Sequence, residues 1–309
     1  MKIRPFDETI DKTRVIDVLD RAIKFENPAL GMNEEQFNAA FDFEGEQTNL
    51  SRDFLVAEDN EGKIIGFAGL IKSSKRDSWR LAIEVLPDYF KSNFFVELFE
   101  SILSLKNEQN GPEVRFSLRK YRLTDSPIQK KLDEMQIKPV HYNWEMLLED
   151  IDQTPEMAVP TGIDIHTGKE IPDLTSFVNV NNEAFSEHFE FRPISVEELK
   201  LILEHAWKAY DIEHWFAYEE EKLVGICTSQ INPEMKTLGI IQILGVLPSY
   251  QHRGIGRYLL ASSIQSLIKK GCKKIELGVE ANNEKALTLY KKFGFNEDES
   301  RTVMIYKTK

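Results

Sequence analysis

The chain has 309 residues, of which 41% are hydrophobic and 29% charged, and its formal net charge is −12. This length suits two globular domains of about 150 residues each. The acidic balance argues against nucleic acid as a partner, because phosphate binding needs a basic surface, whereas a cationic amine is compatible with it.

The start of the chain and its cysteines bear on its location. No stretch reaches the roughly 18 apolar residues of a membrane-spanning helix, and residues 1–8 contain no apolar segment of a secretion signal. Cys227 and Cys272 stand in strand-like or apolar contexts without a metal-ligand spacing. We therefore expect a cytoplasmic protein with two reduced core thiols, no membrane segment and no bound metal.

The chain repeats itself. Residues 54–66 read as a strand, an acidic turn and a second strand, and residues 215–225 have a similar pattern. The segment Val-Leu-Pro-Asp-Tyr at 85–89 matches Val-Leu-Pro-Ser-Tyr at 246–250. In both matches the two copies lie nearly the same number of residues apart, which predicts a duplicated domain. Residues 150–162, where prolines and acidic residues gather, are the predicted linker.

In the second half, strand and helix patterns alternate. Ser195 is an N-cap signal for one helix, and a row of apolar residues followed by Gly271 marks the face and end of another. The predicted elements are strand 163–166, helix 174–187, helix 196–206, strands 215–218, 223–231 and 237–246, helix 256–270 and strand 275–279.

The junction after the strand at 237–246 predicts an anion site. A short turn leads to Gly254 and Gly256, and a long helix begins there. The unpaired N–H groups at a helix start carry partial positive charge, and glycine lets an anion approach the backbone. Arg253 and Arg257 add cationic side chains, although both also fit a solvated surface.

A second pattern follows about thirty residues later. After strand 275–279, Asn282 or Asn283 can cap a helix, and Ala286 and Tyr290 lie four residues apart on one face of it. Gly294 suits a left-handed helix end.

Both patterns resemble one known family. Gln251, Gly254 and Gly256 after Val-x-Pro resemble motif A of the GCN5-related N-acetyltransferases (GNAT), and the Asn283-to-Phe295 pattern resembles their motif B. The resemblance implies an α/β protein made of two tandem GNAT folds, each a mixed, mostly antiparallel central sheet flanked by helices. Tandem members with one silent half, such as mycothiol synthase, have this arrangement.

The two halves differ where the cofactor would bind. In the first half, Asn93 and Phe95 stand at the positions of Gly254 and Gly256, and Leu132 stands roughly at that of Tyr290. A phenylalanine would fill the space of a phosphate. We therefore expect residues 1–150 to form a degenerate domain without the cofactor motif and residues 151–309 to bind acetyl-CoA as the co-substrate. A different ligand in the first half is the alternative.

The resemblance assigns roles to individual residues. The loop would grip the pyrophosphate, the backbone of the central strand would pair with the pantetheine arm, and Tyr290 would protonate the departing thiolate. Tyr290 could instead be a core tyrosine, and Asn283 a helix cap alone. The implied cofactor-binding residues are Leu244, Gly245, Val246, Gln251, His252, Arg253, Gly254, Ile255, Gly256, Arg257, Asn283 and Tyr290.

The general base is less clearly marked. Many relatives carry a glutamate at the position of Ile240 or of Gly278, and neither residue here can accept a proton. Glu280 follows at the same edge of the sheet and is our candidate, although a solvated turn glutamate is the alternative. Gln242 could orient a water molecule, and a water chain serves some members.

The acceptor is expected to bind at the loop of residues 182–193 between the first two helices of this half. His188, Glu190 and Arg192, with Gln242, are the candidate lining residues, although the loop could equally pack its aromatic side chains on the sheet.

The predicted function is acetyl-CoA-dependent N-acetylation of a primary amine of a small molecule or peptide, by direct transfer in a ternary complex. Two other readings stay open: a non-catalytic acyl-CoA sensor or scaffold, and a binding module without CoA. The sequence indicates neither the acceptor nor an oligomeric state.

Overall fold

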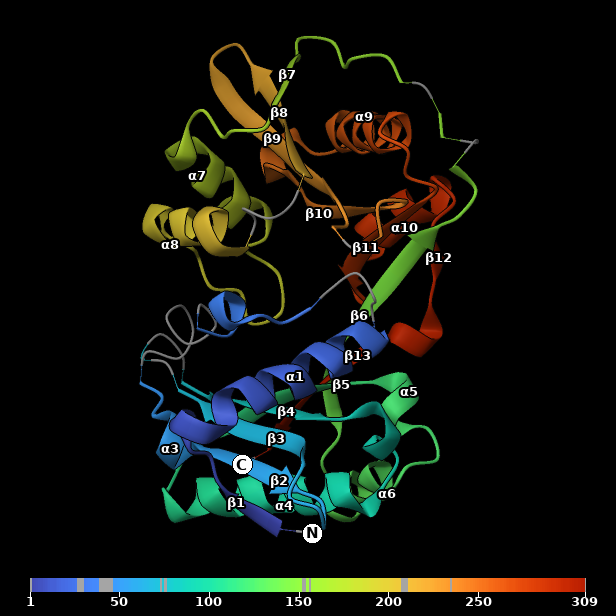
Figure 1. Ribbon diagram of the computed structural model, residues 1–309. Helices are drawn as coiled ribbons and strands as arrows, with labels where there is room; N and C mark the ends of the chain where they lie inside the picture. The colour runs from blue at the N-terminus through green and yellow to red at the C-terminus, as the bar shows by residue number, and fades with distance from the viewer. Residues whose placement is uncertain are drawn as a thin grey trace. The chain divides into compact units, whose positions relative to one another are not determined.

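The computed structural model describes residues 2–26, 31–38, 47–72, 74, 77–151, 154–155, 157–206, 211–233 and 235–308. The chain divides into two compact units (Figure 1). Unit 1 comprises Met1–Tyr142 and Ser300–Lys309, and unit 2 comprises Asn143–Glu299. Parts of the predicted linker, residues 152–153 and 156, lie outside the described residues.

Unit 1 is a sheet with helices packed on it. Its strands lie in the order β1 (Lys2–Pro5), β2 (Phe54–Glu58), β3 (Ile64–Ile71), β4 (Trp79–Val85), β5 (Val114–Arg119) and β13 (Val303–Thr308). All pair antiparallel except β4 with β5. Its helical segments are α1 (Glu8–Glu26), α3 (Leu50–Asp53), the 3-10 turn η1 (Pro87–Tyr89), α4 (Asn93–Glu108), α5 (Lys120–Leu123) and α6 (Pro127–Glu134).

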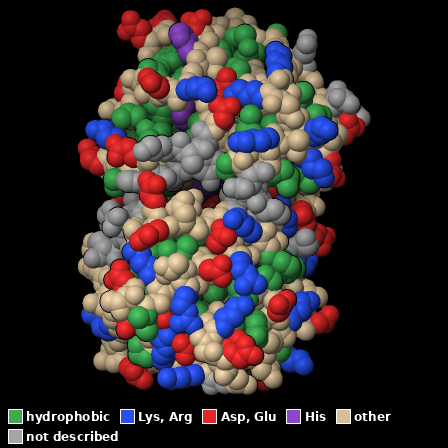
Figure 2. Space-filling view, in the orientation of Figure 1, with side chains coloured by type: hydrophobic (Ala, Val, Ile, Leu, Met, Phe, Trp, Pro, Cys, Tyr) green, Lys and Arg blue, Asp and Glu red, His purple; other side chains and the backbone are tan. Residues whose placement is uncertain are grey.

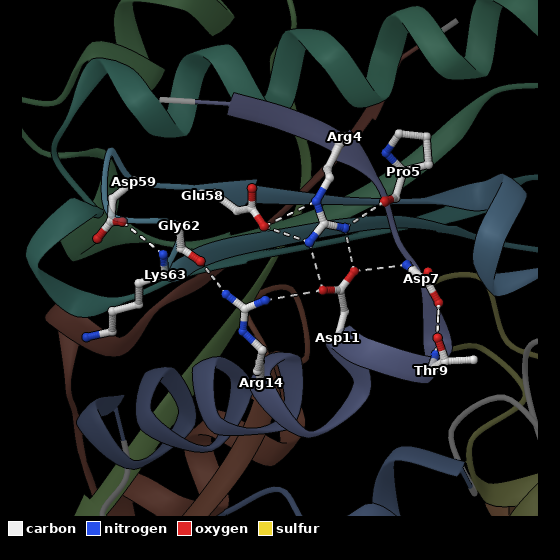
Figure 3. A network of polar contacts seen from close by, with 10 residues as sticks. All are labelled: Arg4, Pro5, Asp7, Thr9, Asp11, Arg14, Glu58, Asp59, Gly62 and Lys63. Carbon is white, nitrogen blue, oxygen red and sulfur yellow. Dashed lines mark hydrogen bonds and ion pairs between the residues drawn. The ribbon is translucent and has the colours of Figure 1, made fainter.

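A buried carboxylate joins the first elements of unit 1 (Figure 3). Asp11, on the first turn of α1, accepts two hydrogen bonds from the Arg4 guanidinium of β1, at 2.6 and 2.8 Å, and one from the N–H of Asp7. Arg4 also donates to Glu58 at the end of β2. Because the Asp11 side chain is fully buried, these partners are what allows it to stay ionised there.

Unit 2 has the same layers. Its strand order is β6 (Pro139–Leu148), β11 (Lys274–Glu280), β10 (Leu238–Val246), β9 (Lys222–Ile231), β8 (Asp211–Glu219) and β7 (Asp164–Gly168), and the short β12 (Asn296–Glu297) also pairs with β6. The 3-10 turn η4 (Pro248–Tyr250) follows β10. The helices are α7 (Leu174–Ala184), α8 (Val196–Leu201), α9 (Ile255–Lys269) and α10 (Glu284–Lys292).

Helices cover both faces of this sheet (Figure 1). A Cβ placed on Gly239 of β10 would lie 2.7 Å from Leu267 of α9, so that helix packs directly on one face. A Cβ on Gly245, on the other face, would lie 3.1 Å from Ala184 of α7. The two glycines therefore let helices approach the central strand from opposite sides.

The predicted α/β class and mostly antiparallel sheet are confirmed, with modest differences at the ends of elements. The first helix of unit 2 ends at Ala184 rather than residue 187, and the second changes after Leu201 into a π-helical turn, Ile202–Ala206. The hairpin strands β8 and β9 are longer than predicted because pairing continues to Asp211 and Lys222. The apolar face of α9 is buried, as its periodicity predicts.

The last strand of each half belongs to the other unit's sheet. Residues 143–148 of β6 pair with β11 in unit 2, and β13, at the end of the chain, pairs with β5 in unit 1. The two units therefore differ from the contiguous halves 1–150 and 151–309 in the assignment of these strands.

Cys227 and Cys272 are both buried and free, as expected. Among the described residues, no helix combines the length and apolar character that crossing a bilayer requires. On the face drawn in Figure 2, acidic and basic side chains are interspersed, so the negative net charge is not gathered into one area there.

Candidate active site

The central strands of unit 2 separate partway along their length. β10 and β11 pair in parallel from Leu238 with Lys274 to Ile241 with Leu277. Beyond this point β10 continues to pair with β9, and β11 continues to pair with β6. Among the described strands, none therefore pairs with the edge of β10 that faces β11 from Gln242 to Val246, and an extended ligand can pair with this edge as an added strand.

A β-bulge marks the place where the strands separate. In the pairing with β9, Ile241 lies opposite Ser229 and Ile243 opposite Thr228, so Gln242 is the extra residue. A bulge bends its strand and increases the local twist. Gln242 is exposed, and the next residues, Ile243 and Leu244, are only partly buried although they lie in a central strand.

The anion cradle lies directly after this strand. Gly254 has φ +85°, a left-handed conformation that favours glycine, and it is the N-cap of α9. Within the described residues, no acceptor contacts the backbone N–H groups of residues 252–257, and the first hydrogen bond of the helix runs from Tyr258 N–H to Gly254 O. A set of free amides therefore points out of the start of a fifteen-residue helix.

Two residues shape the floor of the cradle. A Cβ on Gly256 would lie 3.6 Å from Val246 Cγ2, so the helix start and the end of β10 enclose one space. The Gln251 side chain donates to Val246 O at 3.3 Å and holds the turn against the strand. The structure thus brings together the predicted residues 244–246 and 251–257.

The two arginines of the cradle differ. Arg253 donates to Glu219 at 2.7 Å, and the same carboxylate accepts from the Tyr250 hydroxyl at 2.8 Å. Arg253 is thereby directed to the β8–β9 hairpin. Arg257 is exposed and has no charged partner among the described residues. Arg257 lies in the first turn of α9, beside the free amides of the helix start.

Tyr290 lies on the buried side of α10. Only 8% of its surface is exposed, and its burial, with a smaller contribution from the nearby Cys227 thiol, raises the pKa of the phenol well above its usual value. The hydroxyl therefore stays protonated. Asn283 accepts from Ala286 N–H at 3.1 Å as the N-cap of α10, which confirms the predicted cap and leaves its amide N–H groups for a ligand.

Glu280 ends β11 and contacts the α7–α8 loop. Its Oε1 accepts a hydrogen bond from Phe189 N–H at 2.9 Å and lies 3.7 Å from His188 Nδ1. The structure thus brings together the candidate base and one candidate acceptor residue. At Gly278 of the same strand, an added Cβ would meet no atom within 4 Å, so open space faces this position.

The rest of the loop is held by its own contacts. The Asn182 side chain bonds both the N–H and the carbonyl of Ile194, at 3.0 and 2.9 Å. Arg192 pairs with Glu198 at 3.0 Å, and that carboxylate also completes a capping box with Ser195. Arg192 is thereby held at the start of α8, and its predicted role in acceptor binding stays a prediction. Glu190 adopts φ 53° in the middle of the loop.

Sequence reasoning missed several of these contacts. The Ser-x-x-Glu spacing from Ser195 to Glu198 was a readable capping signal. No local pattern predicts that Glu219 pairs with Arg253, or that Phe189 donates to Glu280 across 91 positions of sequence.

Comparisons with known proteins agree with this geometry. The profile of the acetyltransferase (GNAT) family matches residues 176–295. A mycothiol acetyltransferase of Thermomonospora curvata is 32% identical over 46% of each chain, so that match spans about half of the relative's length. Another, of Catenulispora acidiphila, is 26% identical over 75% of this chain and 74% of its own.

A solved tandem GNAT protein from the clavulanic acid biosynthesis pathway superposes with a TM-score of 0.76. It covers 99% of this chain and 98% of its own, at 13% identity, and so shows the fold alone. Residues 176–295 therefore match the GNAT family of acetyltransferases, and the whole chain has the fold of tandem GNAT proteins.

Proposed function

We propose that this protein is an acetyl-CoA-dependent N-acetyltransferase whose reaction takes place in unit 2. The observation that carries the proposal is the open edge of β10 leading directly to the free amides at the start of α9. Unit 1 is proposed to be a structural or substrate-shaping partner without the cofactor motif.

The residues of unit 2 suit the diphosphate and the pantetheine arm of acetyl-CoA. The diphosphate is to be held by the N–H groups of residues 252–257, with Arg257 as the adjacent cation. The pantetheine arm carries amides, which can pair with the open backbone of residues 242–246 as an added strand does. The side-chain N–H groups of Asn283, at the start of α10, are to donate hydrogen bonds to the same arm.

The chemistry is direct transfer. The neutral amine of the acceptor attacks the thioester carbonyl, a carbon–nitrogen bond forms, and the carbon–sulfur bond breaks. A backbone N–H near Val246 is to hold the oxyanion. Tyr290 gives its proton to the departing sulfur, and the proton lost from the new amide nitrogen restores the phenol through solvent. Burial keeps the phenol protonated for this step.

The relatives support a small-molecule acceptor, because those quoted above are named mycothiol acetyltransferases. The net charge of −12 is compatible with an acceptor that arrives as a cation. Acetylation of a primary amine on a small molecule is the form of the reaction that we propose.

A screen of thiol release tests the proposal. The protein is mixed with acetyl-CoA and a panel of small amines, and free CoA is followed with a thiol reagent. We expect release that depends on both the protein and one class of amine, with the acetylated amine identified by mass spectrometry. Tight binding of acetyl-CoA without release over a broad panel would contradict it.

That outcome would favour the second candidate, a non-catalytic acyl-CoA sensor or scaffold. One observation supports this candidate: neither Ile240 nor Gly278 offers a carboxylate to the separated strands.

A further inference from the structure

The α7–α8 loop reaches both strands that separate. Near its start, the Phe185 ring lies against Gly245 of β10, where an added Cβ would be 3.2 Å from Phe185 Cε2. Further along, Phe189 N–H bonds Glu280 at the end of β11. The segment between these two contacts therefore extends from the end of one strand to the end of the other.

His188 is the titratable side chain held in this segment. Its ring meets the Phe185 ring edge-on, with 4.8 Å between centroids, and its Nδ1 lies 3.7 Å from Glu280 Oε1. Its side chain is 33% exposed, whereas that of Glu280 is 14% exposed. One imidazole nitrogen thus faces a carboxylate while the ring as a whole remains accessible to a ligand.

A base needs a free lone pair and a fixed orientation. Glu280 Oε1 already accepts from Phe189 N–H, so this oxygen is engaged in holding the loop backbone. A carboxylate at Nδ1 of a neutral imidazole favours the proton on that nitrogen, so the lone pair resides on Nε2. The pairing of a base with an orienting carboxylate is a recurrent solution for proton abstraction.

We propose that the His188 imidazole is the general base of unit 2, and that Glu280 is a positioning residue that orients it and fixes the loop. The inference rests on the proposed acetyl transfer and changes the role predicted for Glu280. The 3.7 Å separation exceeds a hydrogen bond, and catalytic hydrogen bonds of unliganded enzymes are often long and tighten only in the complex with substrate.

The proton balance is complete. The acceptor enters as an ammonium ion and gives one proton to His188 Nε2, and the neutral amine attacks the thioester. After Tyr290 protonates the sulfur, the amide nitrogen releases its second proton to restore Tyr290, and His188 releases its own to solvent. The net products are an amide, CoA with its thiol, and one proton.

The first test is independent of turnover. A spectrum that correlates the nitrogens and protons of the histidine rings at alkaline pH reports the tautomer of His188. In the wild type we expect the proton on Nδ1. In Glu280→Gln we expect a mixture of the two tautomers, because a neutral amide stabilises the Nδ1–H form less than a carboxylate does. A dominant Nε2–H tautomer in the wild type would overturn the orientation.

The second test is kinetic and uses the amine found in the thiol-release screen. We expect His188→Ala to lower kcat/KM by about 10²- to 10³-fold with unchanged acetyl-CoA affinity, and added imidazole to restore part of the rate. Glu280→Gln should lower it by about tenfold. The control is His166→Ala, which removes an exposed histidine of β7 in the same unit and should change nothing.

The outcomes separate the two proposals. A wild-type protein that releases CoA, together with a His188→Ala variant of equal rate, overturns the base assignment and keeps the acetyltransferase. A wild-type protein that releases no CoA with any amine overturns the function and the base together, while the tautomer still decides whether Glu280 orients His188.

Discussion

Unit 1 and unit 2 share a strand–turn–helix junction but differ in what it can bind. In both, a central strand ends in Val-Leu-Pro, a 3-10 turn follows, and a long helix begins. In unit 2 the helix starts after Gly254 at φ +85°, and in unit 1 it starts after Ser92 at φ −102°. Phe95, at the position of Gly256, is fully buried. A few side chains thus decide whether the junction can receive an anion.

Two neighbouring strands of unit 1 also separate, but a side chain bridges the gap between them. β4 and β5 pair only at Trp79 and Arg80 among the described residues, so they diverge as β10 and β11 do. Arg122, from the helix after β5, pairs with Glu84 of β4 at 2.9 Å and lies over the Phe90 ring at 4.1 Å. An internal ion pair therefore links the ends of these strands, whereas the edge of β10 in unit 2 is open.

The largest expected effect comes from giving unit 2 the side chain of unit 1. Gly256→Phe should fill the space in front of Val246 and weaken acetyl-CoA binding at least ~100-fold, or about 2.7 kcal/mol, in calorimetric titration. The same substitution at Gly168, at the end of β7, is the control, because its Cβ would meet only Glu170 backbone atoms at 3.8 Å or more. Equal binding of acetyl-CoA by both variants would show that the cradle does not hold the diphosphate.

The next effect concerns turnover. Tyr290→Phe should lower kcat by about 10²-fold or more while the Kd for acetyl-CoA stays unchanged, because only the proton donor to the sulfur is lost. Tyr218→Phe, a half-buried tyrosine of β8, is the matched control. An unchanged kcat would show that the Tyr290 phenol is a core side chain alone.

The ion pair of unit 1 should contribute to stability rather than binding. Arg122→Ala removes a cation that pairs with the partly buried Glu84, and we expect the free energy of unfolding in urea to fall by about 2 kcal/mol. Arg52→Ala breaks a pair whose arginine is 57% exposed and should cost less than about 1 kcal/mol. A gain of a second acetyl-CoA site in Arg122→Ala would show that this pair alone silences unit 1.

The smallest effect separates the two arginines of the cradle. Arg257→Ala should weaken acetyl-CoA binding about three- to fivefold, and the difference should shrink at high salt. Arg253→Ala should change it less than about twofold, because Arg253 already pairs with Glu219. Titrations at two ionic strengths measure both, and the reverse order would place Arg253 at the phosphates.

Much of this fold could be predicted from local sequence patterns. Glycines with φ above +80° at 254 and 294, the Asn283 cap and the apolar face of α9 follow from backbone chemistry and helical periodicity, and all are readable in sequence. The cradle was predictable for the same reason, since its residues are consecutive.

Non-local choices were not predictable. β6 and β13 are extended segments whose sequences do not indicate a partner strand, so no local pattern predicts that the two halves exchange their last strands. The bulge at Gln242 and the Glu280–Phe189 contact depend on how strands far apart in sequence align. The site was therefore predictable where one segment forms it, and not where two segments meet.

The most direct test of the central claim is a crystal structure of the wild-type chain with acetyl-CoA. The account predicts one molecule per chain, with its diphosphate on the amides of residues 252–257 and its pantetheine arm along β10, and no CoA at the Phe95 junction of unit 1. Coenzyme A bound beside Phe95, with the Gly254–Gly256 cradle empty, would contradict it.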